Sequence, residues 1–323
     1  MRTHGGILPQ LSGVLFFPVT PFSPTGDLNL PVLRKHLEDG LSAGPGGVFA
    51  ACGTGEFHSL GPAESAQVVE TAVQVVAGQV PVFAGAGGQV SVAVEQARAA
   101  ARAGADGLLL MPPYLVEGPP RGLARYVETV AAATDLPVIV YHRGNARFDP
   151  ESAATIAELP SVIGLKEGIG DVELMTRIIS SVRTTLDGSD KSFHFFNGLP
   201  TAEVTVPAYA GLGVHLYSSA VFCFAPEVAL RFHHAVTTQD VKLVQRLLDT
   251  FFVPLVALRS KVPGYAVSLV KAGVRLRGLD VGGVRPPLVD PTPEHLEELR
   301  RIIEESSSGD SPFIAADQDT RQH

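Results

Sequence analysis

Lys166 stands at the end of a short apolar segment, Val162 to Leu165, and is followed by Glu167. A lysine that ends a buried strand loses hydration, which lowers the pKa of its amine and leaves more of it neutral near pH 7. A neutral amine can attack a carbonyl carbon and form a Schiff base. The alternative is an ion pair with Glu167 or another carboxylate, which is a common role for a lysine at such a position.

Tyr141 ends the preceding apolar segment, which runs from Pro137 to Val140. If these segments are neighbouring parallel strands, the phenol lies beside Lys166 on the same rim, where it can relay protons. A tyrosine at the end of a core strand can also serve packing alone. The pairing with Lys166 favours a catalytic role.

Two glycines flank Thr54 directly after another apolar segment, in the order Gly53-Thr54-Gly55. The glycines allow a ligand to approach the backbone closely, and Thr54 offers a hydroxyl and an amide to an anion. This turn is a candidate site for a carboxylate. The same residues also form ordinary turns.

Arg143 and Ser218 are further candidates for binding a substrate. Arg143 follows Tyr141 by two residues and could hold a second carboxylate with two hydrogen bonds, although a surface ion pair is the alternative. Ser218 ends the last apolar segment and could donate a hydrogen bond, although serines often cap strand ends.

The elements that position these residues alternate between short apolar segments and longer helical patterns. The periodicity predicts helices between eight strands. Nearly continuous apolar strands separated by helices indicate a parallel sheet, and eight such units favour a (β/α)8 TIM barrel over an open doubly wound sheet. The expected strands are 13–17, 47–51, 80–84, 107–111, 137–141, 162–166, 192–196 and 213–217, and the helices after the seventh and eighth strands are expected at 201–210 and 226–236.

From Gln239 onward the pattern is helical only, with segments at 240–256, 265–273 and 292–305. We therefore expect a catalytic barrel over residues 11–237 and a C-terminal helical subdomain over residues 238–305. The last residues, 306–323, are rich in Ser, Asp and Gln and are predicted to form a mobile tail.

Composition narrows the class of protein. Hydrophobic residues make up 45% of the 323 residues and charged residues 18%, which is typical of a globular domain. No apolar run approaches the ~20 residues of a membrane span, and no signal-type core follows the N-terminus, so a cytoplasmic protein is expected. Two cysteines exclude a disulfide framework and a four-cysteine metal site. A net charge of −8 without a basic stripe argues against nucleic acid as a partner.

Several of these segments resemble the dihydrodipicolinate synthase and N-acetylneuraminate lyase superfamily and, within it, the 5-dehydro-4-deoxyglucarate dehydratases. The superfamily resemblance is carried by residues 17–22 (FPVTPF), 53–57 (GTGEF), 138–141 (VIVY) and 164–168 (GLKEG). The resemblance to the dehydratases rests on residues 198–204 (GLPTAEV), 217–222 (YSSAVF), 264–273 (GYAVSLVKAG) and 284–288 (VRPPL).

The resemblance implies a Schiff base on Lys166, a proton relay through Tyr141 and a substrate carboxylate at Gly53 and Thr54. It implies a decarboxylating dehydratase that converts the sugar acid 5-dehydro-4-deoxy-D-glucarate to 2,5-dioxopentanoate, CO2 and water, without a metal or an organic cofactor. It also suggests a homo-oligomer, either a dimer or a tetramer built from dimers.

This chain departs from the synthases at three positions. Synthases have a second threonine where Gly53 stands, a second tyrosine at Leu115 and an arginine near Ala146, and their absence argues against dihydrodipicolinate synthesis. Relative to the dehydratases, His142 and Gly144 replace Asn and Asp, while Arg143 is kept.

Three other functions are compatible with a barrel of this kind. A class I 2-oxo-acid aldolase would use the same lysine, and a non-catalytic barrel could bind a sugar acid as a sensor. Metal-dependent hydrolysis is disfavoured because the predicted strand ends lack a His/Asp ligand cluster.

Overall fold

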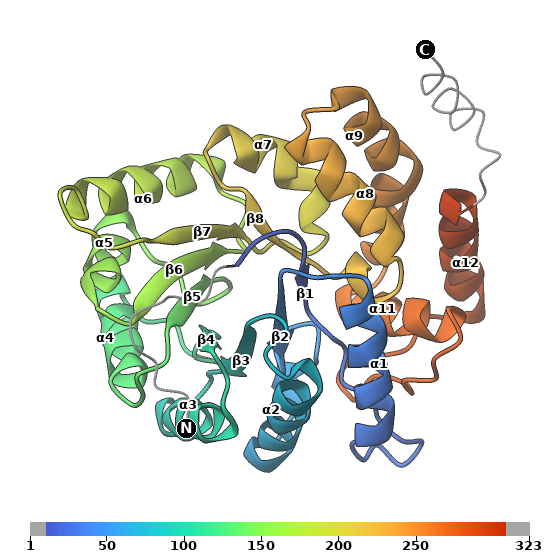
Figure 1. Ribbon diagram of the computed structural model, residues 1–323, viewed down its shortest axis with the longest axis horizontal. Coiled ribbons are helices and arrows are strands. Elements are labelled where there is room, and N and C mark those ends of the chain that lie inside the picture. The colour runs from blue at the N-terminus through green and yellow to red at the C-terminus, as the bar shows by residue number, and fades with distance from the viewer. Residues whose placement is uncertain (1–10, 308–323) are drawn as a thin grey trace.

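Eight parallel strands close into a barrel in the computed structural model, which describes residues 11–307. Each strand pairs with its neighbours in chain order, and β8 pairs with β1 (Figure 1). Closure confirms the predicted (β/α)8 barrel and excludes the open sheet. The strands are β1 Leu15–Phe16, β2 Gly47–Ala50, β3 Val82–Ala86, β4 Gly107–Leu110, β5 Val138–His142, β6 Val162–Glu167, β7 His194–Asn197 and β8 Leu216–Ser219.

A helix follows each strand and covers the outside of the barrel (Figure 1). These helices are α1 Leu30–Ser42, α2 Pro62–Val76, α3 Val90–Ala103, α4 Pro120–Ala131, α5 Pro150–Glu158, α6 Val172–Thr185, α7 Val206–Gly211 and α8 Pro226–Thr237. Short 3-10 turns precede α2, α7 and α8, at η1 Phe57–Ser59, η2 Ala202–Thr205 and η3 Val221–Cys223.

The sequence signals at helix ends have direct structural counterparts. Asp149 caps α5 by accepting a hydrogen bond from the Ser152 amide at 2.8 Å, with Pro150 in the first turn. Gly104 ends α3 with φ +84°, a left-handed conformation that costs glycine little.

Two apolar layers hold the barrel together. The interior contains a separate cluster in which the rings of Phe17, Phe49 and Phe83 stack in sequence, with centroids 4.4 and 5.0 Å apart. The larger cluster lies between the strands and the surrounding helices. The barrel interior is therefore a packed core and not a pore.

Several predicted elements differ from the structure, and β1 and β3 each begin two residues later than the expected strands 13–17 and 80–84. The seventh and eighth strands begin two and three residues later than expected, and Gly213, at φ +79°, belongs instead to the turn that ends α7. The helix expected from residue 201 is divided into η2 and α7, since Thr201 has a left-handed φ of +53°. The helix expected at 240–256 is divided into α9 Val241–Leu247, the π-helical turn η4 Leu248–Phe252 and α10 Val253–Arg259. Pro254 has no N–H to continue the helical ladder, which accounts for the irregular turn before it.

Two further helices complete the C-terminal part, α11 Tyr265–Leu276 and α12 Pro293–Ser307. Figure 1 shows these helices, in orange and red, gathered on one side of the barrel. Ser306 and Ser307 end α12, and the rest of the predicted tail lies outside the described residues. Within residues 11–307, no helix combines the length and the apolar character needed to cross a membrane.

Candidate active site

Lys166 points from β6 into the barrel, where only 6% of the residue is exposed. Its Nζ atom lies 4.6 Å from the centroid of the Phe17 ring and 4.2 Å from that of Tyr141. Burial lowers the pKa of the Lys166 amine below its ordinary value, and the nearby Tyr141 and Cys52 side chains offset only part of this effect. A larger share of the amine is therefore neutral and nucleophilic.

The orientation of Lys166 depends on a bulge in β6. The register with β5 slips at this point, so that Val138 pairs with Val162 while Ile139 pairs with Gly164. Ile163 belongs to the barrel interior, whereas Leu165 packs in the outer layer, so one extra residue reverses the alternation. Without the bulge, Lys166 would face the helices.

Glu167 faces the opposite side of the sheet and is not the partner of Lys166. Its Oε1 accepts hydrogen bonds from the amides of Ile169 and Gly170 at 2.6 and 2.8 Å, and its Oε2 accepts one from the Tyr209 hydroxyl. The carboxylate thus stabilises the β6–α6 loop. The rim ion pair considered as an alternative for Lys166 is not formed with this residue.

Tyr141 stands opposite Lys166 in the register of β5 and β6. Its hydroxyl donates a hydrogen bond to the Gly198 carbonyl at 2.6 Å and accepts one from Arg143 Nη1 at 2.8 Å. Burial raises the pKa of Tyr141, but the charges of Lys166 and Arg143 and the hydrogen bond from Arg143 outweigh it, so the pKa is lowered overall. A phenol held in this way is suited to exchange a proton with a bound ligand.

Two glycines leave room for this pair of side chains. A Cβ on Gly198 would lie 2.6 Å from Lys166 Cγ, and a Cβ on Gly168 would lie 2.7 Å from Tyr141 Cε2. Both separations are too short for non-bonded carbon atoms. The glycines therefore permit the close approach of the lysine and the tyrosine to the backbone.

A cavity of about 520 Å³ opens above Lys166 and Tyr141 at the carboxyl ends of the strands. All six residues proposed from the sequence line it, because Gly53, Thr54, Arg143 and Ser218 surround the lysine and the tyrosine. Active sites of (β/α)8 enzymes form at this end of the barrel. The volume is adequate for a six-carbon acid.

Arg259 also lines the cavity and was not among the residues predicted from the sequence. It comes from α10, and its Nη1 donates hydrogen bonds to the Pro200 carbonyl at 2.5 Å and to Thr201 Oγ1 at 2.9 Å. Burial and the nearby charge of Arg143 lower the pKa of Arg259. The cavity thus carries two guanidinium groups, which favours an anionic ligand. Arg259 lies far from any strand end, so no signal in the sequence links it to the site.

Other candidate side chains have structural roles. His142 is buried, and its Nδ1 accepts a hydrogen bond from the Phe148 amide at 3.0 Å. Burial lowers the pKa of His142 to about 4, so the ring is neutral near pH 7. Among residues 11–307, no group of three or more His, Cys, Asp and Glu side chains is placed to hold a metal ion.

Comparison with known proteins relates this site to a family. Residues 10–306 match the model of the dihydrodipicolinate synthetase family. The chain belongs to this family. Among curated relatives, "Probable 5-dehydro-4-deoxyglucarate dehydratase 1" of Streptomyces coelicolor is 58% identical over 293 residues, covering 91% of this chain and 92% of the relative. A protein of Paracidovorax citrulli with the name "Probable 5-dehydro-4-deoxyglucarate dehydratase" is 45% identical over 295 residues, covering 91% and 95%.

Solved structures of the same family share the barrel and the C-terminal helices. Dihydrodipicolinate synthase from Bacillus clausii superposes with a TM-score of 0.83 at 23% identity, covering 91% of this chain and 97% of the other. YagE from E. coli K12, a prophage protein of the dihydrodipicolinic acid synthase family solved in complex with pyruvate, superposes with a TM-score of 0.80 at 25% identity, covering 91% and 98%. Members of the family use a lysine Schiff base, and Lys166 is the buried lysine of this member that faces the cavity.

Proposed function

We propose that this protein is a 5-dehydro-4-deoxyglucarate dehydratase that releases 2,5-dioxopentanoate, CO2 and water. The observation that carries the proposal is the buried Lys166 amine facing Tyr141 at the base of a cavity with two guanidinium groups. Relatives that are 45–58% identical over nine-tenths of the chain are named as probable 5-dehydro-4-deoxyglucarate dehydratases.

The first step is attack of Lys166 Nζ on the ketone carbon next to a substrate carboxylate. A carbon–nitrogen bond forms, and loss of the ketone oxygen as water yields an iminium ion. The lowered pKa of Lys166 supplies the neutral amine that this attack needs. Tyr141, with its hydroxyl held between Gly198 and Arg143, would donate the proton that the departing oxygen requires.

The iminium ion makes the neighbouring CH2 group acidic, because the electron pair left by its proton delocalises onto the nitrogen. Tyr141 would relay that proton to the hydroxyl on the next carbon, which leaves as water. A conjugated iminium remains. No net oxidation or reduction occurs in this sequence, so no redox partner is required.

Decarboxylation uses the same electron sink. The far carboxylate leaves as CO2, and the electron pair of the broken carbon–carbon bond moves through the conjugated system to the nitrogen. Protonation and hydrolysis by water then restore Lys166 and release the dioxo acid. One lysine thereby serves both dehydration and decarboxylation.

The substrate would span the cavity between two anion sites. The carboxylate next to the ketone would bind at Gly53 and Thr54, and the far carboxylate would bind near Arg143 and Ser218. Arg259 lies on the same cavity wall and would add positive charge at the far end. Two anion sites at opposite ends would favour a diacid.

Incubation with 5-dehydro-4-deoxy-D-glucarate tests this proposal. We expect stoichiometric CO2 and 2,5-dioxopentanoate, and we expect borohydride to trap the substrate covalently on Lys166. Lys166→Ala should abolish both product release and trapping. Pyruvate and an aldehyde as products would instead identify an aldolase. Absence of trapping together with an active Lys166→Ala variant would contradict a Schiff-base enzyme of either kind.

We also propose that the enzyme is a cytoplasmic homo-oligomer, either a dimer or a tetramer. This proposal rests on membership of the family. Light scattering of the purified protein gives the molar mass directly, and a monomer at micromolar concentration would contradict it.

A further inference from the structure

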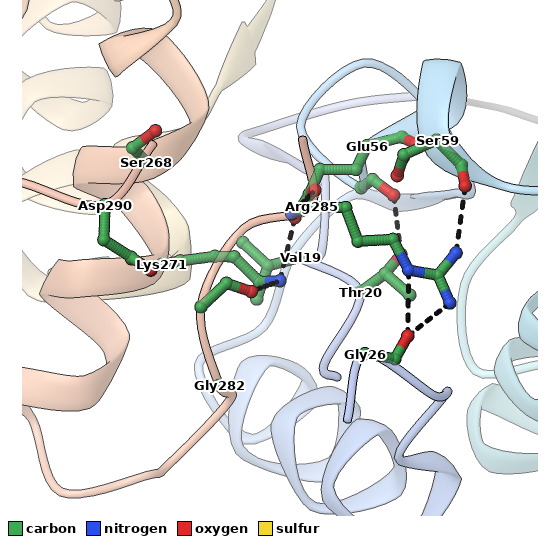
Figure 2. Close-up of polar contacts among 12 residues, drawn as sticks. Val19, Thr20, Gly26, Glu56, Ser59, Ser268, Lys271, Gly282, Arg285 and Asp290 are labelled. Carbon is green, nitrogen blue, oxygen red and sulfur yellow. Dashed lines mark hydrogen bonds and ion pairs between the residues drawn. The ribbon is translucent and has the colours of Figure 1, made fainter. Parts of the chain in front are cut away.

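Three charged residues that are distant in sequence meet next to the turn of Gly53 and Thr54, and Figure 2 shows their contacts. Glu56 lies in the loop between β2 and α2, Lys271 lies in α11, and Arg285 lies between α11 and α12. Glu56 and Lys271 are both fully buried, with Lys271 Nζ 2.8 Å from Glu56 Oε1. The backbone N–H of Arg285 donates a hydrogen bond to Glu56 Oε2 at 2.9 Å. We refer to Glu56, Lys271 and Arg285 as the loop clamp.

Lys271 joins the C-terminal part of the chain to the first loop of the barrel. Besides pairing with Glu56, its Nζ donates a hydrogen bond to the Gly283 carbonyl at 2.7 Å and lies 4.1 Å from the centroid of the Phe22 ring. A cation at this distance from an aromatic face is attracted to it. The lysine thus contacts three separate segments at once.

Arg285 connects the loop clamp to the β1–α1 loop and to the end of the β2–α2 loop. Its guanidinium donates hydrogen bonds to the Gly26 carbonyl at 2.6 and 2.9 Å and to the Ser59 carbonyl at 2.9 Å (Figure 2). It also makes a two-pronged ion pair with Glu64, through contacts of 2.5 and 2.9 Å, and lies 4.0 Å from the Phe22 ring centroid. The β1–α1 loop, the β2–α2 loop and the segment before α12 are therefore tied together.

The clamp acts on the turn that presents Gly53 and Thr54 to the cavity. Glu56 has φ +58° and ψ +41°, a left-handed conformation that is unfavourable for a residue with a side chain. Its amide donates a hydrogen bond to the Gly53 carbonyl at 3.2 Å, which closes the turn around Thr54. Contacts that hold Glu56 in place therefore also hold the turn.

Stability alone is a weak reason for such a cluster. Burying two opposite charges costs hydration that their attraction does not reliably return. None of the three residues is among those that line the cavity, so none would touch a substrate. Two of the segments that carry the resemblance to the dehydratases contain Lys271 and Arg285, and no step of the proposed reaction uses either residue.

We infer that the loop clamp is a positioning device, through which the C-terminal helices set Gly53 and Thr54 for the carboxylate next to the substrate ketone. This inference rests on the proposed function, because it presumes that Gly53 and Thr54 bind that carboxylate. Glu56, Lys271 and Arg285 are accordingly positioning residues. Loosening them should weaken binding at the near end of the substrate while Lys166 and Tyr141 stay in place on the strands.

Pyruvate is the appropriate probe, because it carries the carboxylate and the ketone and only a methyl group beyond them. The experiment measures the pyruvate concentration that half-saturates borohydride trapping on Lys166, and the limiting trapping rate, in the wild type and in Lys271→Met. We expect the half-saturating concentration to rise on the order of 10-fold, with a limiting rate that changes much less. Lys261→Met is the matched control, since Lys261, in the turn between α10 and α11, pairs with Glu298 of α12 at 2.6 Å near the surface, and the change should leave both values unaltered.

Glu56→Gln is the second variant, and it tests the positioning role of the loop clamp if Lys271→Met does not fold. It keeps the volume of the side chain and an acceptor for the Arg285 amide but removes the charge that pairs with Lys271, so a smaller rise of about threefold is expected. Unchanged half-saturation in a folded clamp variant, or an equal rise in Lys261→Met, would overturn the inference. Failure of the wild type to trap pyruvate and the sugar acid would instead overturn the proposed function, and the inference with it.

Discussion

Tyr141 and Lys166 occupy facing positions on β5 and β6, and the lysine amine lies 4.2 Å from the centroid of the tyrosine ring. This relationship exists because the bulge at Ile163 and Gly164 turns Lys166 inward, and because Gly198 leaves space beside its side chain. The two groups also affect each other's protonation. Nucleophile and proton relay therefore form one electrostatic unit, and changes to their neighbours should be visible in pH profiles.

The pH dependence of pyruvate trapping should shift in opposite directions in Tyr141→Phe and Arg143→Ala. Tyr141 raises the pKa of Lys166, so its removal should move the rising limb of the trapping rate to lower pH. Arg143 lowers the pKa of Lys166, so its removal should move that limb to higher pH. Single-turnover trapping across a pH series measures both shifts. Shifts of the same sign would contradict the proposed coupling.

Tyr141→Phe should also separate Schiff-base formation from turnover. Phenylalanine keeps the ring beside Lys166 but removes the hydroxyl that contacts Gly198 and Arg143. Loss of a proton relay typically lowers kcat by about 10²–10⁴-fold. We therefore expect CO2 release to fall within that range. Borohydride should still trap the sugar acid, but more slowly than in the wild type, because Tyr141 also supplies a proton during Schiff-base formation. Full turnover in this variant would exclude Tyr141 as the relay.

Gly198→Ala should disable the lysine without removing it. The new Cβ would lie 2.6 Å from Lys166 Cγ and 2.8 Å from its Cε, so the side chain must move. A displacement of this size near a reacting group can reduce the rate about 10²-fold. Gly211→Ala is the control, because nothing lies within 4 Å of a Cβ at that position. The measurement is the rate of borohydride trapping on Lys166 in the two variants. Equal rates would refute the prediction.

Arg143→Lys should distinguish the far end of the substrate from the near end. Lysine keeps the positive charge but cannot bind a carboxylate in two-pronged fashion. Charged hydrogen bonds contribute about 1.5–3 kcal/mol, so KM for 5-dehydro-4-deoxy-D-glucarate should rise roughly 10- to 100-fold. Half-saturation by pyruvate, which has no second carboxylate, should change little. If KM for the sugar acid and the half-saturating concentration of pyruvate rose by the same factor, Arg143 would not act at the far carboxylate.

Much of the site could be predicted from the sequence, because strand ends of a parallel barrel converge. Alternating elements predicted the barrel, and the barrel predicted that Lys166 and Tyr141 share a rim. The bulge that turns Lys166 inward could not be predicted in the same way. Simple alternation along β6 from Ile163 would have placed the lysine on the outside.

Residues that enter the site from outside the barrel could not be predicted from local patterns in the sequence. Arg259 reaches the cavity from α10, and its position depends on how the C-terminal helices pack, which periodicity does not specify. The same holds for the contact between Glu56 and Lys271, which are separated by more than two hundred residues. Local patterns predict elements and their ends, whereas such contacts depend on the tertiary arrangement.

Glu203 should make the stability of the protein depend on pH. It is fully buried in η2, and its Oε1 accepts a hydrogen bond from Ser219 Oγ at 2.6 Å. Burial raises the pKa of Glu203 to about 7, and the hydrogen bond from Ser219 offsets only part of that rise. Because the folded state holds the proton more tightly, the stabilisation from protonated Glu203 is fully present below the unfolded pKa and is lost as the pH rises through about 7.

The Glu203→Gln variant is neutral at this position at every pH and keeps an acceptor for Ser219. The free energy of unfolding of this variant, relative to that of the wild type, should therefore rise by on the order of 3 kcal/mol between about pH 5 and about pH 8. Urea denaturation at the two pH values measures the difference. Glu227→Gln, at a half-exposed surface pair with Arg277, should show no such trend, and a constant difference for Glu203→Gln would mean that the buried carboxyl group does not titrate in this range.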